Sequence, residues 1–207
     1  PLVFAILLSA LVHDTVVRIF LTSASEYYRL INIPIAWFGA IGATSAAFGI
    51  FVPKIAQRMV AKNSIQKNYL VVSLFTILGL VGISLAIPIW GVAMVFFFSV
   101  GFGLLNFFGS HYLNAEVDSR RRATVLSFRG LALNLGFAAI SVIFGGILKY
   151  LRDGGESVPG ASDSAFRDSL FWLPGIFLLM LAALWIYYLA KVRPILDSKA
   201  PDDADSS

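Results

Sequence analysis

Six long runs of mostly apolar residues follow one another along this chain, and they constrain its fold more than any other feature. The runs cover residues 2–24, 33–52, 69–87, 90–112, 125–148 and 170–189. A helix needs about 20 such residues to cross the hydrocarbon core of a bilayer. Strands of an outer-membrane barrel would instead alternate apolar and polar residues over about 10 positions. The sequence therefore predicts an all-α integral membrane protein with six transmembrane helices.

The composition agrees with this class and excludes several others. Of the 207 residues, 58% are hydrophobic and 14% are charged, with a mean hydropathy of +0.81. A soluble domain has about 45–50% apolar and about 25% charged residues. The chain has no cysteine and only two histidines, so no metal-ligand spacing is present and we expect neither a metal nor a cofactor. The basic residues are divided among several loops, which argues against a nucleic-acid partner.

The distribution of charge predicts the orientation. The chain divides into a six-span bundle, residues 1–190, and an acidic tail, residues 191–207, which we expect to be disordered. An even number of spans places both ends on one side. The basic residues on that side are Lys54, Arg58, Lys62, Lys67, Arg120, Arg121, Arg122, Arg129, Lys191, Arg193 and Lys199, against Arg29, Lys149, Arg152 and Arg167 on the other. The positive-inside rule then predicts that loops 53–68 and 115–124 and the C-terminus are cytoplasmic.

The first span carries two charged residues, Asp14 and Arg18. Each costs at least about 2.5–3.5 kcal/mol near the centre of a spanning helix, so each needs a reason. Their i,i+4 spacing predicts an ion pair, and Thr22 continues the same polar face. Two interpretations are open: these residues line a pathway for a proton or a charged substrate, or they lock the helix to a neighbour. His13 projects about 100° away and is predicted to form a hydrogen bond between helices.

Polar and small residues mark three other spans. Asn106 and Ser110 lie on a polar stripe of the fourth span, where they either face a cavity or form hydrogen bonds between helices. Small or polar residues share faces of the second and fifth spans, and we expect these faces to pack closely against other helices. Those packing residues are Gly39, Ala43, Asn134 and Gly145.

No enzyme motif is present. The sequence lacks the Walker, G-x-S-x-G and H-E-x-x-H patterns, and no set of nucleophile, base and metal ligands converges. We therefore expect that the chain is not an enzyme, and an ATP-driven pump is unsupported.

One segment is more specific than the composition. Residues 114–127 read Asn-Ala-Glu-Val-Asp-Ser-Arg-Arg-Arg-Ala-Thr-Val-Leu-Ser, an acidic and Arg-rich loop followed by the start of the fifth span. This segment resembles the carboxyl-terminal half of bacterial major facilitator superfamily (MFS) transporters, and the whole chain matches such a half in span number and loop length. The family's Gly-x-x-x-Asp-Arg loop is only partly kept, because residues 49–58 contain Gly49 and Arg58 without the Asp-Arg pair.

The resemblance implies a particular architecture and function. It implies an MFS half-bundle of inverted three-helix repeats, a missing N-terminal six-helix half, and a cavity lined by the first and fourth spans. The function implied is secondary active transport of a small molecule across the bacterial inner (plasma) membrane, with protons as the coupling ion. It also suggests a cytoplasmic latch in which Arg122 pairs with Glu116 or Asp118.

The direction of transport stays open at this stage. The Phe-rich spans and the sparse charge favour efflux of amphiphilic compounds. Uptake of a sugar or an organic anion is the alternative, with Arg18 as the partner of the anion. A self-contained six-span scaffold or sensor is a third interpretation, and it would require a second copy of the chain.

Overall fold

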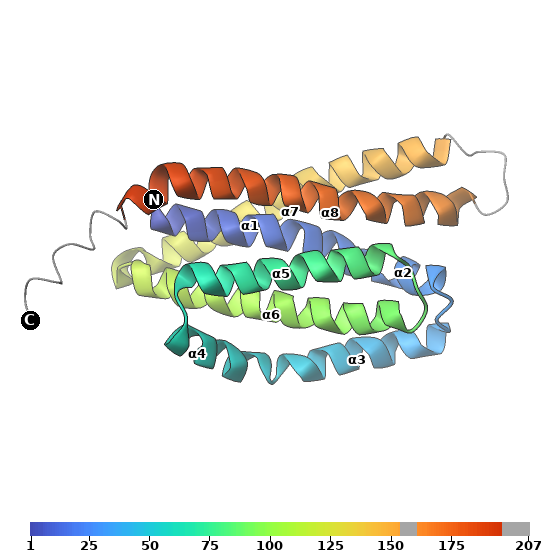
Figure 1. The fold of residues 1–207 in the computed structure, drawn as a ribbon, viewed down its shortest axis with the longest axis horizontal. Coiled ribbons are helices and arrows are strands. Elements are labelled where there is room, and N and C mark those ends of the chain that lie inside the picture. Colours follow the sequence, from blue (N-terminus) through green and yellow to red (C-terminus); the bar gives the residue numbers. More distant parts are fainter. Residues whose placement is uncertain (154–160, 196–207) are drawn as a thin grey trace, which may run out of the picture.

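The computed structural model describes residues 1–153 and 161–195, and the elements of this part are helices joined by short turns (Figure 1). They are α1 (Leu2–Thr22), α2 (Ala24–Leu30), the 3-10 helix η1 (Ile35–Trp37), α3 (Phe38–Gly49), α4 (Val52–Lys62), α5 (Ile65–Ser84), α6 (Trp90–Glu116), α7 (Ser119–Asp153), α8 (Ala161–Tyr187) and the π-helix η2 (Tyr188–Val192).

Six helical stretches are long and apolar enough to cross a membrane. They are Leu2–Thr22, Ile35–Lys62, Ile65–Ser84, Trp90–Glu116, Ser119–Arg152 and Asp163–Ile195. The second combines η1, α3 and α4. The stretches run side by side, and the N-terminus, the α4–α5 turn and the α6–α7 turn lie at the same end of the bundle (Figure 1). We call this the basic end, because Lys62, Lys67 and Arg120 to Arg122 lie there.

The first span forms the centre of the bundle. α1 packs on α5, α6, α7 and α8. Of the 18 consecutive residues that are most apolar in each span, 56% are buried in the first span and 11% in the second and the fifth. Phe20 of α1 lies edge-on to Phe98 of α6 and to Tyr27 of α2, with ring centroids 5.6 and 5.3 Å apart. The helix that carries Asp14 and Arg18 therefore packs against four of the other long helices.

The prediction that residues 53–68 form a loop is wrong, because most of this segment is helical. α4 runs from Val52 to Lys62, α5 starts at Ile65, and only two residues separate them. α4 is amphipathic: Val52 and Ala56 are buried against α6, while Lys54 and Arg58 are exposed. A helix with a charged outer face lowers the average hydropathy, and it therefore resembles a loop in a search for apolar runs.

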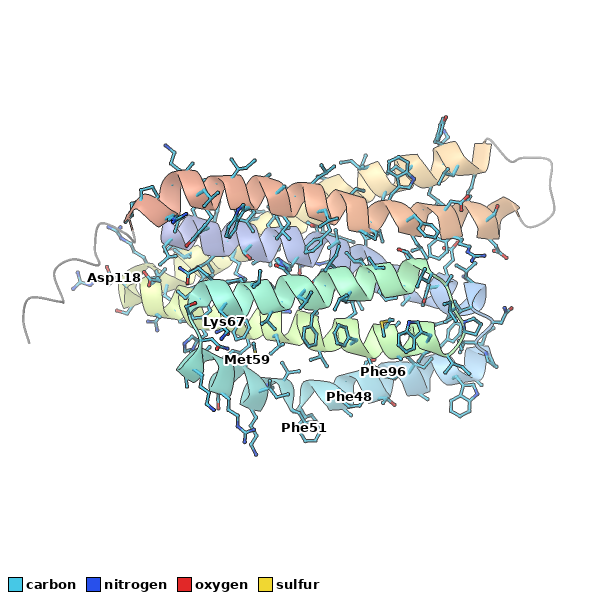
Figure 2. The ribbon with its side chains drawn as sticks, viewed as in Figure 1. Phe48, Phe51, Met59, Lys67, Phe96 and Asp118 are labelled. Carbon is cyan, nitrogen blue, oxygen red and sulfur yellow. The ribbon has the colours of Figure 1, made fainter. Side chains whose placement is uncertain are left out.

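The break inside the second span lies between α3 and α4. Phe51 at this break is 63% exposed and points away from the bundle (Figure 2). On the α3 side, Phe48 contacts Phe96 of α6, with ring centroids 5.7 Å apart. The second span therefore changes direction along the surface of α6.

The segments between the last three apolar runs are also shorter than predicted. Within 115–124, only Val117 and Asp118 lie outside a helix, because α7 already begins at Ser119 (Figure 2). Between the apolar runs that end at residue 148 and begin at residue 170, α7 extends to Asp153 and α8 begins at Ala161. The last helical stretch continues to Ile195, past the expected end of the bundle, and the expected disordered tail lies outside the described residues from 196 onward.

The α5–α6 turn is as tight as the sequence predicts. Five residues separate Ser84 from Trp90, and two of them, Ala86 and Ile89, have left-handed backbone angles with φ of 50° and 63°. Non-glycine residues rarely adopt this region, because the Cβ atom crowds the backbone. The sharp reversal therefore stores local strain, which the packing of α5 on α6 must offset.

Candidate functional site

The ion pair predicted from the i,i+4 spacing is present in α1. Nη2 of Arg18 lies 2.6 Å from Oδ2 of Asp14, and the exposed fractions of the two side chains are 28% and 5%. The carboxylate is thus nearly enclosed by protein, while the guanidinium reaches the surface of the bundle. Pairing reduces the cost of placing both charges inside a span.

Arg18 also joins α1 to α7. Its Nη1 donates to Oδ1 of Asn134 over 2.9 Å, and its Cζ lies 5.2 Å from the ring centroid of Phe137. Asn134 is exposed and accepts this hydrogen bond between α7 and α1 at an open surface, and its close packing between helices stays a prediction. We call Asp14, Arg18 and Asn134 the polar triad. It combines one negative, one positive and one neutral group within the spans.

The threonines next to the triad bond to their own helix. Thr15 donates to the carbonyl groups of Leu11 and Val12. Thr22 is exposed, and it donates to the carbonyl groups of Arg18 and Ile19 over 3.0 and 2.9 Å. Thr22 thus extends the polar face toward the end opposite the basic end without contributing a contact between helices.

Asn106 and Ser110 lie on α6, and neither forms a hydrogen bond to the polar triad. Asn106 donates to the Phe102 carbonyl in its own helix, and Ser110 accepts a long hydrogen bond of 3.5 Å from Arg129. At about 1.5 Å per residue, Ser110 lies about 9 Å and Asn106 about 15 Å from the basic end of α6, and Asp14 lies about 18 Å from the start of α1. The hydrogen bonds of Asn106 and Ser110 do not reach the polar triad, so these contacts do not join the predicted pathway residues into one group.

His13 forms the interhelical hydrogen bond that its position predicts. The ring is fully buried, with Nδ1 2.8 Å from the Ser9 carbonyl and Nε2 2.9 Å from Oγ of Ser73 in α5. The Ser73 hydroxyl also lies 2.9 Å from the Tyr69 carbonyl in α5, and it can donate its single proton to that carbonyl or to Nε2 of His13. The ring also lies edge-on to Phe177 of α8 at 5.1 Å. His13 thus joins three helices.

A second polar group near the basic end was not predicted. It contains Arg129 of α7 and Tyr69 of α5. Both Nε of Arg129 and the hydroxyl of Tyr69 are buried without a hydrogen-bond partner. Beside them, Asn68 donates to the Tyr112 hydroxyl over 2.6 Å. Arg129 lies inside the apolar run 125–148, and this position distinguishes it from the loop arginines with which we grouped it.

The expected latch has a different geometry in this conformation. Nη2 of Arg122 donates to the Asn114 carbonyl over 3.2 Å, and within residues 1–153 and 161–195 no ion pair joins Arg122 to Glu116 or Asp118. Arg122 thus holds the last turn of α6, where unpaired carbonyl groups attract positive charge. An acidic partner for this arginine stays a prediction.

The expected packing glycines face open space. An added Cβ at Gly39 or Gly145 would meet no atom within 4 Å, and Ala43 is exposed. No described helix packs closely on these residues, and their close packing against other helices stays a prediction. Other glycines allow the helices to approach, among them Gly103, where a Cβ would lie 3.0 Å from Val52.

An ion pair closes the opposite end of the bundle. Nη2 of Arg152 in α7 lies 3.2 Å from Oε1 of Glu26 in α2. Next to it, burial raises the pKa of Tyr27 to about 12, and the charge of Tyr28 adds to this shift. The Tyr27 phenol, which packs against Gly91, is therefore neutral at physiological pH. This end joins α2, α6 and α7.

No protein-family model, curated protein or solved structure matches this chain. The fold itself defines the class. The described part of the chain is all-helical, with six helices long and apolar enough to cross a bilayer, which fits an integral multi-pass membrane protein.

Proposed function

We propose that this chain is one six-span half of an MFS-type secondary transporter, which moves a small molecule by alternating access coupled to protons. The other half of the transporter is a further six-span bundle. The proposed direction of transport is efflux of amphiphilic compounds. The observation that carries this proposal is the polar triad.

The triad presents charge and an amide at an open surface within the spans. A guanidinium facing hydrocarbon would cost at least about 2.5–3.5 kcal/mol, and an unpaired amide is costly there as well. Arg18 is 28% exposed and Asn134 is exposed, so we infer that water or another protein, rather than lipid, covers this face. A water-filled pathway between two halves supplies such a cover.

The packing pattern supports the inverted three-helix repeat. An inverted repeat relates the first, second and third spans to the fourth, fifth and sixth. A contact between the first and the fifth spans must therefore have a counterpart between the fourth and the second. Both contacts are present: α1, the first span, packs on α7, the fifth, and α6, the fourth span, packs on α3 and α4, which belong to the second. The second and the fifth spans are also equally exposed, since only 11% of the most apolar 18-residue stretch of each is buried. A missing half would cover them.

The charge distribution supports a cytoplasmic position for the basic end. Lys54, Arg58, Lys62, Lys67 and Arg120 to Arg122 lie there, whereas Arg29, Lys149 and Arg152 lie toward the opposite end. From the positive-inside rule we infer that the end with more basic residues lies in the cytoplasm and that the protein lies in a bacterial inner membrane.

Asp14 is the residue that we propose to carry the proton. As a carboxylate it holds Arg18, and protonation would remove its charge and weaken that contact. Arg18 would then be free to move relative to Asn134 of α7 or to attract the negative charge of a substrate. One protonation thus changes the contact between the first and the fifth spans, which is what coupling requires.

The test is gradient-driven flux by the native gene product in inverted membrane vesicles. The probes are ethidium and rhodamine 6G for efflux, and radiolabelled succinate and lactose for uptake. Asp14→Asn is expected to lower flux driven by a pH gradient about 5- to 150-fold, the usual range of coupling between two sites, while downhill exchange is retained. Asp168→Asn, which neutralises an exposed carboxylate near the start of α8, is the matched control.

Two results would contradict the proposal. Equal pH-dependent flux in wild type and Asp14→Asn would remove Asp14 from the coupling step. Absence of gradient-driven flux for all four probes, together with a stable symmetric dimer of native six-span chains in detergent, would reject the missing-half transporter in favour of a self-contained scaffold or sensor.

A further inference from the structure

Arg129 brings a positive charge into the fifth span without an acidic partner among the described residues. The two ion pairs in residues 1–153 and 161–195 belong to Arg18 and Arg152. Arg129 donates one long hydrogen bond of 3.5 Å to Ser110, and its Nε is buried without a partner. Most of its donors are therefore unused at the edge of the apolar region, where an unpaired charge is costly.

A glycine on α6 makes room for this side chain. A Cβ added at Gly109 would lie 3.0 Å from Nη2 and 3.5 Å from Cζ of Arg129, so the guanidinium rests directly on the helix backbone. This contact holds the planar group beside Ser110 rather than letting it extend along α7. A long side chain held in one place loses less entropy when it binds a ligand.

Tyr69 adds a second unused donor from α5. Its hydroxyl is buried without a hydrogen-bond partner, and its ring lies 6.1 Å from the ring of Tyr112, which follows Ser110 by two residues in α6. The neighbouring Tyr112 hydroxyl accepts a hydrogen bond from Asn68 and does not pair with that of Tyr69. Three helices thus direct a guanidinium and hydroxyl groups to one region, and such donors suit an acceptor with negative charge.

We propose that Arg129, Ser110 and Tyr69 form a binding site for one anionic oxygen group, a phosphate or a carboxylate, near the basic end of the bundle. Guanidinium N–H groups match the oxygens of these anions in pairs, and the hydroxyls supply further donors. Arg129 lies about 15 Å from the start of α7, and its long side chain allows the charged group to reach toward the headgroup level.

Two sources can supply the anion, and neither depends on the transport proposal. The phosphate of an anionic phospholipid is one, since basic clusters at a membrane surface attract such lipids. A free carboxylate or phosphate solute is the other. Binding is measured on the protein without any gradient, so a failure of transport leaves this proposal intact, and the reverse also holds.

The experiment compares binding by the purified native gene product in neutral detergent. Native mass spectrometry follows phosphatidylglycerol against phosphatidylcholine, and isothermal titration follows inorganic phosphate and succinate in lipid-free samples. We expect at least one anion to bind and Arg129→Gln to weaken that binding about tenfold or more. Arg121→Gln removes an equal charge from an exposed position at the start of α7 and is expected to change affinity by less than about twofold.

The outcomes separate the sources and can overturn the site. Preference for phosphatidylglycerol without binding of either solute identifies a headgroup, and the reverse result identifies a solute. Equal anion binding by wild type and Arg129→Gln, or no anion preference in the wild type, overturns the proposal. If Arg129→Gln fails to fold, the double variant Tyr69→Phe, Ser110→Ala keeps the charge and removes both hydroxyls, and unchanged affinity in that variant also overturns it.

Discussion

The two arginines inside the spans are stabilised differently, and the difference begins with the neighbours of each residue. Arg18 has an acid one helical turn earlier, so its charge is paired within α1. Arg129 has no acid at that spacing in α7, and its side chain instead lies on Gly109 of α6. The same residue type therefore forms a self-contained pair in one helix and an open donor site in another.

The His13 contacts give a stability prediction at the residue scale. Ser73→Ala removes the hydroxyl that faces Nε2 of His13 and leaves this nitrogen unpaired in a fully buried position. We expect a loss of about 0.6–1.7 kcal/mol in the free energy of unfolding, which spans the average and the maximum measured for hydrogen bonds between membrane helices. The measurement is reversible unfolding in mixed micelles.

Ser99→Ala is the matched control for this variant. Ser99 donates to the Val95 carbonyl in its own helix, so its loss breaks no contact between helices. A smaller effect than that of Ser73→Ala is expected. Equal stability losses in the two variants would show that the His13 contact adds nothing beyond an ordinary local hydrogen bond.

At the scale of the elements, glycine positions decide how closely the helices approach. The glycines that we selected from repeats on the second and the fifth spans face open space. The glycines that do pack lie under large side chains of another helix, as Gly79 of α5 does beneath Phe98 of α6. Spacing along one helix cannot identify such contacts, because the partner residue comes from a different segment.

Gly79→Ala is expected to destabilise the bundle by about 1–3 kcal/mol, the usual cost of overpacking a core. A Cβ there would lie 2.6 Å from Cδ2 and 3.2 Å from Cβ of Phe98. Phe98 cannot move away easily, because its ring is buried and packs against Phe20. The measurement is the midpoint of thermal unfolding in detergent.

Gly145→Ala is the comparison for Gly79→Ala. It adds the same methyl group at an open position of α7, where higher helix propensity favours alanine by up to about 1 kcal/mol. A rise or no change in the unfolding midpoint is therefore expected. If Gly145→Ala destabilises the chain as much as Gly79→Ala, the described packing of α5 on α6 does not explain the loss.

At the scale of the whole molecule, the charge distribution predicts a single orientation. The chain contains no cysteine, so one introduced thiol reports the side of the membrane on which it lies. Arg121→Cys marks the basic end and Arg29→Cys marks the opposite end, and both residues are exposed. A membrane-impermeant maleimide is expected to label Arg29→Cys in intact cells and Arg121→Cys only in inverted vesicles.

The reversed labelling pattern would place the basic end outside the cell. Labelling of both thiols in intact cells would instead indicate two orientations or leaky membranes. A lysed-cell sample, in which both thiols should react, serves as the control for chemical accessibility. The result bears on the anion site as well, because it decides which leaflet can supply a lipid headgroup.

The element types and several local contacts were predictable from the sequence alone. In hydrocarbon a run of about 20 apolar residues satisfies its backbone hydrogen bonds by forming a helix, which accounts for the six long helices. The Asp14–Arg18 pair follows from a spacing of four residues within one helix. The helix boundaries were less predictable, because amphipathic α4 and the polar first turns of α7 and α8 lower the local hydropathy as loops do.

Only the tertiary structure decided which helices meet. The contact of Arg18 with Asn134 and the approach of Arg129 to Ser110 join residues far apart in the sequence. Each depends on the rotation and height of two helices, which hydropathy and spacing along one segment do not specify. The long apolar runs and the need for backbone hydrogen bonds determine that this chain forms six helices able to cross a membrane, whereas the packing of side chains between helices determines where its few polar groups come together.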